Sequence, residues 1–409
     1  MQPTELLKEG QSLRRHDRAE SIACFEESIQ RAESVNDEML ISNALTELAI
    51  ELIEIGQTTA LGRAKSLLNR STYLLDKLDI DQSLSNSIQS VNQIAVTKQQ
   101  KTHIVYAQGL LSLQEGNFRE AIAQFEKISE NYADDQEMSA TLNQSLAEAY
   151  IALGDFKTCL SYLEIPTSIA QKGNNYEQLG RVNLHLDRYA LAKDYFERSL
   201  DIALENDDKY LRIQAFIGLS QVAIAEEQWE NAVTVIKEVI SELEEPLDLH
   251  LSAYLYLNLA EAKLGMGKML EAQEYVENYA IPRFEKLQNQ HGLACGKRTL
   301  ARILSCSLSK GMDEISEESI EAIADEFLEA LIIFEKYGIP QEKAKTLYDL
   351  SYLYTLCHES RNRYQFQGKA VRSLEQALTI LEQLRDDSPA LVSKIEISLN
   401  ELMGGFVFL

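Results

Sequence analysis

Proline and glycine are scarce in this chain, which has six prolines and eighteen glycines among its 409 residues. No stretch rich in these two residues divides the sequence, so nothing in it indicates a flexible linker between separate globular domains. The length still exceeds what one hydrophobic core usually supports. A stacked array escapes that limit because each unit contacts only its neighbours. We therefore expect one elongated body.

Cysteine is also rare, and no two cysteines form a CxxC pair. An odd and scattered set is typical of small buried residues in a reducing compartment. The start of the chain has no basic segment followed by an apolar core, and no apolar run is long enough to span a membrane. These absences predict a cytoplasmic location. The cysteines are Cys24, Cys159, Cys295, Cys306 and Cys357.

Positive charge is in deficit, with 39 basic against 64 acidic residues and a formal net charge of −25. This balance argues against nucleic acid and against an anionic membrane surface as partners, because both require clusters of lysine and arginine. The densest acidic stretch contains no basic residue from Gly311 to Ala330. It fits a solvated helix face, and the alternative is a docking face for a basic partner.

Catalytic signatures are missing as well. The sequence contains no glycine-rich phosphate loop, no HExxH and no GxSxG. His291, Cys295 and Cys306 would share one helical face, but a zinc site normally has more closely paired ligands, so core packing is the better interpretation. The neighbours Cys357 and His358 would point about 100° apart on a helix and cannot form a nucleophile and base pair. We expect no catalytic residues, no metal and no cofactor.

What the chain does contain is a recurring stripe, in which a small residue is followed four places on by a large one and three further on by another small or apolar residue. Offsets of four and three place such residues on one side of a helix, where the small residue lets a neighbouring helix approach. Clear examples are Ala121-Phe125-Ile128, Ala192-Phe196-Ser199 and Ala370-Leu374-Ala377. The stripe starts, at intervals of 33 to 57 residues, at Ser21, Ala64, Ala121, Cys159, Ala192, Ala232, Ala272, Ile323 and Ala370.

A second amphipathic segment precedes each stripe, and short turn signals such as Glu115-Gly116-Asn117, Gly154-Asp155 and Gly265-Met266-Gly267 separate the two. Glycine is typical of a helix end because it adopts left-handed backbone angles without strain. Each unit is therefore predicted to be a helical hairpin, and hairpins that cannot bury an apolar face alone must stack.

At this point the chain resembles the tetratricopeptide repeat family, from about residue 3 to about residue 385. The central units carry the signature residues Tyr176, Leu179, Gly180, Tyr189, Ala192 and Phe196, and then Phe216, Leu219, Trp229 and Ala232. Ser21 and Ile323 replace the usual alanine in the outer units. The long period is similar to that of bacterial signalling regulators and kinesin light chains. The resemblance implies an all-α, right-handed α-solenoid of about nine hairpins with a C-terminal capping helix.

The expected organisation has four parts. Residues 1–78 form two N-terminal hairpins, residues 79–100 form a polar linker or a long helix, and residues 101–385 form the main array, with an insertion near 311–319. Residues 386–409 form a capping helix, Pro389 to Met403, and an apolar tail, Gly404 to Leu409. The tail covers the last repeat, or it occupies the groove of its own chain, or it offers a motif to a partner.

By the geometry of the family, the first helix of each hairpin lines the concave side, so the binding residues are expected there. Aromatic residues would anchor a peptide, and polar residues would satisfy its backbone. Leu110, Ile217 and Leu257 share these positions but fit packing between repeats equally well. The predicted groove residues are Tyr106, Gln144, Glu148, Glu177, Arg181, Gln221, Glu261, Tyr348 and Tyr352.

The sequence thus predicts a non-catalytic scaffold or adaptor that binds a peptide or protein segment in its concave groove. The alternative is a peptide-responsive signalling regulator that controls a partner protein. DNA-binding sensors of that class begin with a helix-turn-helix, whereas Thr4 to Ala32 here already resembles a repeat. The lysine and asparagine clamp of chaperone-binding members is also missing. The partner's identity and the oligomeric state stay open.

Overall fold

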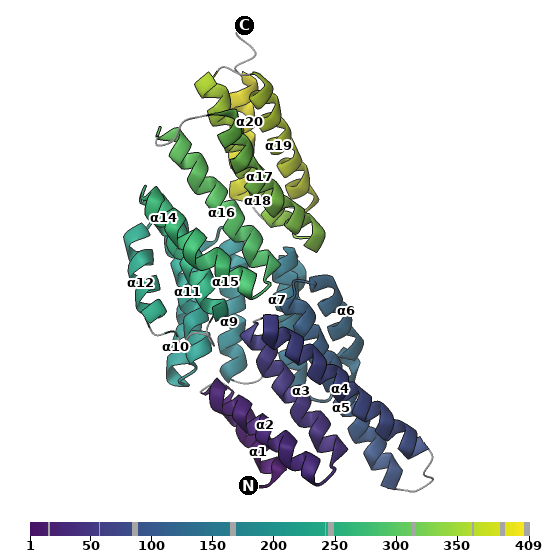
Figure 1. The fold of residues 1–409 in the computed structure, drawn as a ribbon. Helices are drawn as coiled ribbons and strands as arrows, with labels where there is room; N and C mark the ends of the chain where they lie inside the picture. The colour runs from purple at the N-terminus through teal and green to yellow at the C-terminus, as the bar shows by residue number, and fades with distance from the viewer. Residues whose placement is uncertain are drawn as a thin grey trace.

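The fold consists of helical hairpins that follow one another along the chain (Figure 1). The computed structural model describes residues 1–14, 17–56, 58–83, 89–163, 169–241, 243, 249–311, 316–361, 364–384 and 389–404. Over these ranges the secondary structure is helical, with no strand.

Each hairpin has a first and a second helix. The first helices are α1 (Pro3–Leu13), α3 (Glu38–Ile55), α5 (Gln89–Gln114), α7 (Gln136–Leu153), α9 (Ile169–His185), α11 (Lys209–Ala225), α13 (Leu249–Gly265), α16 (Gln290–Ser309) and α18 (Pro340–Arg361). The second helices are α2 (Arg18–Ser34), α4 (Thr58–Ser83), α6 (Phe118–Ser129), α8 (Phe156–Tyr162), α10 (Tyr189–Glu205), α12 (Trp229–Ser241), α14 (Met269–Tyr275), α17 (Glu317–Tyr337) and α19 (Tyr364–Gln383).

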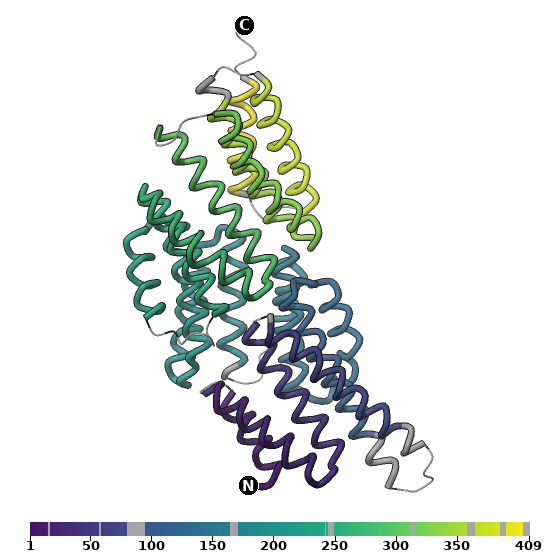
Figure 2. The backbone as a smooth tube through the Cα atoms, in the orientation of Figure 1, coloured from purple at the N-terminus to yellow at the C-terminus, as the bar shows by residue number. Residues whose placement is uncertain are grey.

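Three short elements and one final helix complete the list. They are the 3-10 turn η1 (Glu130–Tyr132), the π-helical turn η2 (Val276–Ala280), α15 (Ile281–Lys286) and α20 (Pro389–Gly404). α14 continues through η2 into α15, so α14, η2 and α15 together form the second helix of the seventh hairpin. The nine hairpins wind into a right-handed α-solenoid (Figure 2). The predicted fold class is confirmed.

The recurring stripe is the buried part of each hairpin. Ala192, Phe196 and Ser199 are fully buried. The ring of Phe196 lies where a glycine on α9 leaves room, since a Cβ added to Gly180 would come within 2.6 Å of it. The same match of glycine on the first helix and phenylalanine on the second joins Gly10 to Phe25 and Gly109 to Phe125. This match explains why a glycine of the first helix lies opposite the phenylalanine of the stripe in several hairpins.

The turns between helices contain the glycines that the sequence predicts at helix ends. Gly116, Gly154 and Gly267 adopt φ values of 80°, 78° and 75°, in the left-handed region that favours glycine. Aspartates begin many of the helices, where their carboxylates accept a hydrogen bond from an otherwise unpaired backbone N–H. Examples are Asp37, Asp135, Asp155 and Asp208, with N···O distances of 3.0 to 3.1 Å.

Residues 79–100 are mostly helical. α4 continues to Ser83 and α5 begins at Gln89, and residues 84–88 between them lie outside the described residues. The distal ends of α4 and α5 extend beyond the neighbouring hairpins, at the lower right of Figure 1. In the predicted insertion, residues 312–315 also lie outside the described ranges, and Ser316 caps α17.

The capping helix is α20. Its Ile395 is fully buried and packs with Leu374 of α19, and the Nε2 amide of Gln367 donates a hydrogen bond to the carbonyl of Leu402 at 2.8 Å. The apolar face of the ninth hairpin is thereby covered, as a terminal repeat requires. Gly404 is the last residue of α20, and the rest of the predicted tail, residues 405–409, lies outside the described chain.

Successive turns of the superhelix touch one another. One core cluster joins Phe125 and Leu146 of the third and fourth hairpins to Phe284 and Phe334 of the seventh and eighth. At the surface of this contact the ring of Tyr337 lies against Gly116, where an added Cβ would be 3.4 Å from it. An ordinary repeat array has contacts only between neighbouring repeats. Here the array packs against itself as well.

Candidate ligand-binding inner surface

The first helices carry a row of polar side chains at intervals of three and four residues, which places each row on one helical face. On α13 the row is His250, Tyr254, Leu257 and Glu261. We call the polar members of these rows, together with Arg14 after the end of α1 and Arg18 at the start of α2, the inner surface. It comprises Arg14, Arg18, Glu47, Glu51, Glu54, His103, Glu148, Glu177, Arg181, His185, Tyr210, His250, Tyr254, Glu261, His291, Arg298, Arg302, Glu342, Lys345 and Asp349.

Several members of the inner surface lie close to members on other hairpins. Burial is the main cause that lowers the pKa of His250 to about 4, and the charges of Arg18 and Arg181 lower it further. Burial is also the main cause that lowers the pKa of His291, on α16, and the charges of Arg298 and Arg181 lower it further. The guanidinium carbon of Arg18 lies 5.5 Å from the centre of the Tyr210 ring, so the first and sixth hairpins meet. Members of the inner surface on the first and sixth hairpins are therefore neighbours in space.

Arg181 lies on α9, the first helix of the fifth hairpin. Burial opposes its charge most strongly, but Glu177 and Glu148 overcome that effect and raise its pKa. Its side chain is nevertheless 30% exposed. Arg181 is therefore a partly exposed charge that lies among acidic neighbours.

Glu177 lies one helical turn before Arg181 and is 7% exposed. Burial raises the pKa of Glu177 to about 7, Arg181 opposes the rise, and Glu148 adds to it. The nearest oxygen of Glu177 is 3.9 Å from Nη1 of Arg181, too far for a hydrogen bond. This carboxylate and guanidinium are therefore only loosely paired.

Two tighter charge networks flank the centre. On the C-terminal side, Nη1 of Arg302 lies 2.7 Å from both carboxylate oxygens of Glu261, and Arg298 pairs with Glu342. Asp349 lies 3.6 Å from Arg302 and 3.8 Å from Arg298. These pairs hold α13, α16 and α18 together.

On the N-terminal side, Arg14 pairs with Glu47 and Glu51, and Nη2 of Arg18 lies 3.0 Å from Glu54. Glu51 is fully buried. Burial is the main cause that raises its pKa to about 7. The first two hairpins thus contribute charged side chains to the inner surface.

The structure brings several of the predicted groove residues together. Glu148, Glu177 and Arg181 interact electrostatically at the centre. Glu261 belongs to the C-terminal network, where Thr299 donates a hydrogen bond to it at 2.7 Å. Gln221 lies on the same face of α11 as Tyr210 and is partly buried.

Other predicted residues lie elsewhere. Tyr106 is buried in the core at 7% exposure, and its hydroxyl lies 3.3 Å from Ser145 Oγ, so it cannot reach a ligand in the groove. Gln144 is occupied in joining α7 to α9, since its Nε2 donates to the carbonyl of Gln171 at 2.8 Å and to Asn175 Oδ1 at 2.7 Å. Tyr348 packs against the core of the ninth hairpin, whereas Tyr352 is 46% exposed.

Sequence reasoning predicted Arg181 but missed the other arginine members and the histidine members of the inner surface. It predicts His291, Cys295 and Cys306 on one helical face, and the distance between Cys295 Sγ and His291 Nε2 is 3.9 Å. Continuing that face by three and then four residues would have added Arg298 and Arg302. Within the described ranges no three histidine, cysteine or acidic residues are grouped to hold a metal.

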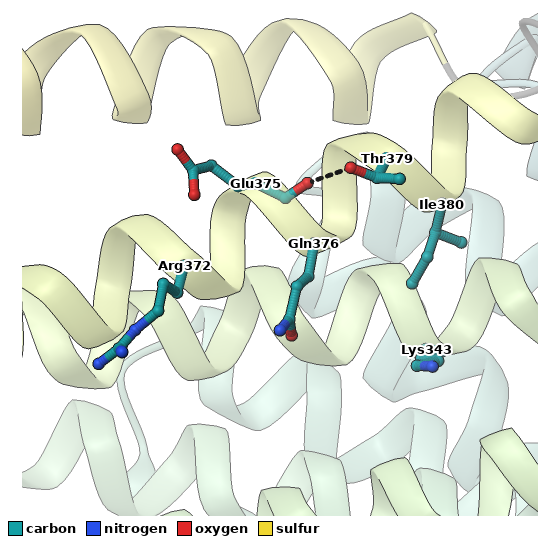
Figure 3. Close-up of a pocket in the computed structure, with 6 residues that line it drawn as sticks. All are labelled: Lys343, Arg372, Glu375, Gln376, Thr379 and Ile380. Atoms are coloured by element: carbon teal, nitrogen blue, oxygen red, sulfur yellow. Dashed lines mark hydrogen bonds between the residues drawn. The ribbon is translucent and has the colours of Figure 1, made fainter.

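A separate depression of about 440 Å³ lies on another part of the last hairpin (Figure 3). It is lined by Lys343 of α18 and by a face of α19 from Arg372 to Ile380. None of the predicted groove residues lines it, so it is distinct from the inner surface.

His185 and His250 are expected to remain neutral at about pH 5, where an exposed histidine is mostly protonated. Burial lowers their pKa to about 3 and about 4, respectively. Because the folded pKa lies below the unfolded value of about 6.5, their contribution to stability is complete above that pH and is lost as the pH falls. An NMR titration of the imidazole signals would measure this directly.

The contribution of Glu177 to stability is expected to depend on pH in the opposite direction. Its pKa is raised on folding, so its contribution is present below about pH 4.5 and is lost as the pH rises through about 7. Replacing Glu177 with glutamine should remove that loss between pH 5 and 8 in urea unfolding. For the preceding prediction, imidazole signals of His185 and His250 that titrate near pH 6.5 would contradict the expectation that burial keeps these histidines neutral.

Comparison with known proteins supports the repeat assignment. The tetratricopeptide repeat family matches residues 173–206, which span most of α9 and all of α10. No curated protein matches the sequence. No helix in the described part of the chain is both long and apolar enough to cross a membrane.

Solved structures share the fold at low sequence identity. The Rap conjugation gene regulator of the plasmid pLS20, in complex with the Phr* peptide, has a TM-score of 0.56 and 15% identity, over 93% of this chain and 98% of that one. Aspartyl phosphate phosphatase F from Bacillus subtilis has a TM-score of 0.50 and 17% identity, over 95% of each chain.

A third structure, the APC/C hetero-tetramer Cut9-Hcn1, has a TM-score of 0.50 and 13% identity, over 94% of this chain and 74% of that one. These likenesses concern the fold. The family model identifies residues 173–206 as a tetratricopeptide repeat, and the solved structures show that the fold of the chain is that of a solenoid of helical hairpins.

Proposed function

We propose that this protein is a non-catalytic scaffold that binds a peptide or an extended protein segment against its inner surface. The observation that carries the proposal is that polar side chains of the inner surface from hairpins far apart in the sequence lie close together, as the guanidinium carbon of Arg18 does 5.5 Å from the centre of the Tyr210 ring. A polar surface shared by several hairpins suits a narrow ligand such as an extended peptide.

The chemistry of the inner surface also favours a peptide. Carboxylates, guanidinium groups, imidazoles and tyrosine hydroxyls alternate along it, and together they match the donors, acceptors and charges of a peptide. Its charges are nearly balanced, so the large negative charge of the chain resides mainly on its outer surface. A basic partner would therefore bind the outer surface, whereas the peptide would bind the inner surface.

A peptide-responsive regulator is the second candidate. The turns of the superhelix touch at Arg18 with Tyr210 and at Gly116 with Tyr337. A ligand that changed the width of the interior would alter these contacts and hence the outer shape. The likeness to a regulator solved with a bound peptide supports this candidate.

The test uses a photo-crosslinking amino acid placed at Gln221, on the inner face of α11. The matched control places it at Tyr73 of α4, which is 68% exposed on the outside. We expect the Gln221 derivative to capture a short linear segment from a lysate of the native cells, mapped by mass spectrometry. Equal capture of the same protein at Tyr73, or no product at Gln221, would contradict binding in the interior.

A further inference from the structure

The superhelix touches itself at contacts that join one hairpin to the hairpin five places further along the chain. Arg18 of the first hairpin lies against Tyr210 of the sixth. At three further contacts, a Cβ added to a turn glycine would come within 3.4 to 3.7 Å of a side chain on the later hairpin. These pairs are Gly56 with Leu287 (second and seventh hairpins), Gly116 with Tyr337 (third and eighth) and Gly154 with Gln341 (fourth and ninth). We call the four contacts the seam.

The seam is made by helix ends and single side chains. Within the described ranges no two helices five hairpins apart pack along their length, whereas the two helices of one hairpin do. Three of the four contacts use a glycine, which has no side chain to interlock with the opposite hairpin. The core cluster shared by Phe125 and Phe334 adds apolar contact and favours the closed form. Few groups must nevertheless separate for the seam to open.

All four contacts join hairpins 1–4 to hairpins 6–9, so rotation at one place beside the fifth hairpin would separate them together. The junction of the fifth and sixth hairpins is interlocked. The ring of Phe196 fits the gaps at Gly180 of α9 and Gly218 of α11, where an added Cβ would come within 2.6 and 2.3 Å of it. Gly173 of α9 accommodates Leu211 of α11 in the same way. Such close apolar packing resists sliding.

The junction of the fourth and fifth hairpins is polar by contrast. Nε2 of Gln144 on α7 donates to the carbonyl of Gln171 at 2.8 Å and to Oδ1 of Asn175 at 2.7 Å. Nε2 of Gln178 donates to the carbonyl of Gln144 at 2.9 Å. Gln178 is only 6% exposed, yet its Oε1 has no hydrogen-bond partner among the described residues. A small slide of α9 along α7 would let these amides exchange partners, as in shear motions of packed helices.

We propose that the superhelix opens and closes along the seam, by rotation of hairpins 1–4 against hairpins 5–9 at the junction of α7 and α9. The apolar cluster of Ile151 and Val182, at the C-terminal ends of these helices, is the pivot, and the amides are the part that slides. Because Arg18 and Tyr210 both belong to the inner surface, opening changes the spacing of its members. This device is a property of the fold and does not depend on the ligand being a peptide.

A disulfide engineered at one seam contact tests the proposal through a reporter at another. A Cβ at Gly154 would lie 3.7 Å from Cβ of Gln341, within the range of about 3.5–4.5 Å for disulfides. The lock is therefore Gly154→Cys with Gln341→Cys. The reporter is Gly116→Cys, since the atoms nearest to a Cβ there all belong to Tyr337. Iodoacetamide labels the full chain, and peptide mapping by mass spectrometry gives the rate at each position.

Cys357 is the internal control for unfolding, because it is 1% exposed in the core of the last hairpins. In the reduced chain we expect position 116 to react about tenfold or more faster than Cys357, with little dependence on urea, because opening the seam exposes little surface. Oxidation should slow the reaction at position 116 about tenfold or more if the seam opens as a unit. Oxidant should change nothing in chains with Gly154→Cys alone or Gln341→Cys alone. Circular dichroism checks that each variant is folded.

Two more reporters locate the hinge. Asn175→Cys lies at the junction of α7 and α9, and Leu211→Cys lies at that of α9 and α11, where the native side chains are 4% and 2% exposed. Oxidation should slow labelling at position 175, whereas position 211 should react as slowly as Cys357 in both states. The reverse pattern would overturn the hinge at α7 and α9.

The opening itself fails on any of three results. Equal rates at position 116 in the reduced and oxidised chains would show that the contacts do not open together. A rate at position 116 that matches Cys357 in size and in urea dependence would show that the seam separates only on unfolding. A lock that does not form in the folded chain would contradict the contact of Gly154 with Gln341.

Discussion

Replacing Phe196 with alanine is expected to lower the free energy of unfolding by about 3–5 kcal/mol, the range for removing a buried phenylalanine. The ring is fully buried between α9 and α11, where Gly180 and Gly218 leave space for it. Urea unfolding followed by circular dichroism would measure the change. Leu191→Ala on the same helix is the control, because Leu191 is 42% exposed and should lose less than about 1 kcal/mol.

A second substitution makes this prediction sharper. A Cβ added at Gly218 would lie 2.3 Å from the Phe196 ring, so Gly218→Ala should destabilise the wild type. In the Phe196→Ala background the same change should stabilise by up to about 1 kcal/mol, because alanine favours a helix more than glycine does. The effect therefore reverses its sign between backgrounds. The same sign in both would show that the ring does not occupy this space.

Replacing Arg298 with methionine is expected to cost about 3–5 kcal/mol, the range for removing one partner of a buried ion pair. Burial pushes the pKa of Glu342 upward, but the charges of Lys345 and Arg298 hold it well below its usual value. Burial raises the pKa of Asp349, and Arg302 and Arg298 oppose that rise. Without Arg298, both carboxylates lose a compensating charge in a desolvated place.

Two further substitutions test the prediction for Arg298→Met, one that should compensate for it and one that serves as a control. Adding Glu342→Gln to Arg298→Met should recover part of the lost stability, since the uncompensated charge disappears. Arg198→Met removes an arginine whose pair with Asp194 is exposed, and it should cost less than about 1 kcal/mol. If Arg298→Met cost no more than Arg198→Met, the C-terminal network would contribute little to holding α16 and α18 together.

The hairpins were predictable from sequence because they depend on local patterns. The stripe at Ala192 and Phe196, the glycine turns and the capping helix each involve residues within about one repeat, and the structure confirms the all-α solenoid built from them. No pattern of this kind encodes the contact of Gly116 with Tyr337. That contact follows from the small rotation accumulated over several repeats, which no single repeat specifies.

The binding residues were predictable only in part, for the same reason. The helical period placed Glu148, Glu177 and Arg181 on first helices, but it could not tell which neighbouring positions meet across the interior. Tyr106 has the spacing of a groove residue, yet its hydroxyl lies beside Ser145 of the next hairpin in the core. Apart from Tyr106, Gln144 and Tyr348, the predicted positions are compatible with the proposed binding role.

The contact of Tyr337 with Gly116 also bears on how the protein is made. A ribosome adds about 5–20 residues per second, so roughly 10–45 s pass between the synthesis of Gly116 and that of Tyr337. During that interval the early hairpins can stack locally, but the surface that Tyr337 later covers has no partner. The nascent chain therefore exposes this surface until the eighth hairpin emerges, and that delay is the period in which a chaperone would have most to bind.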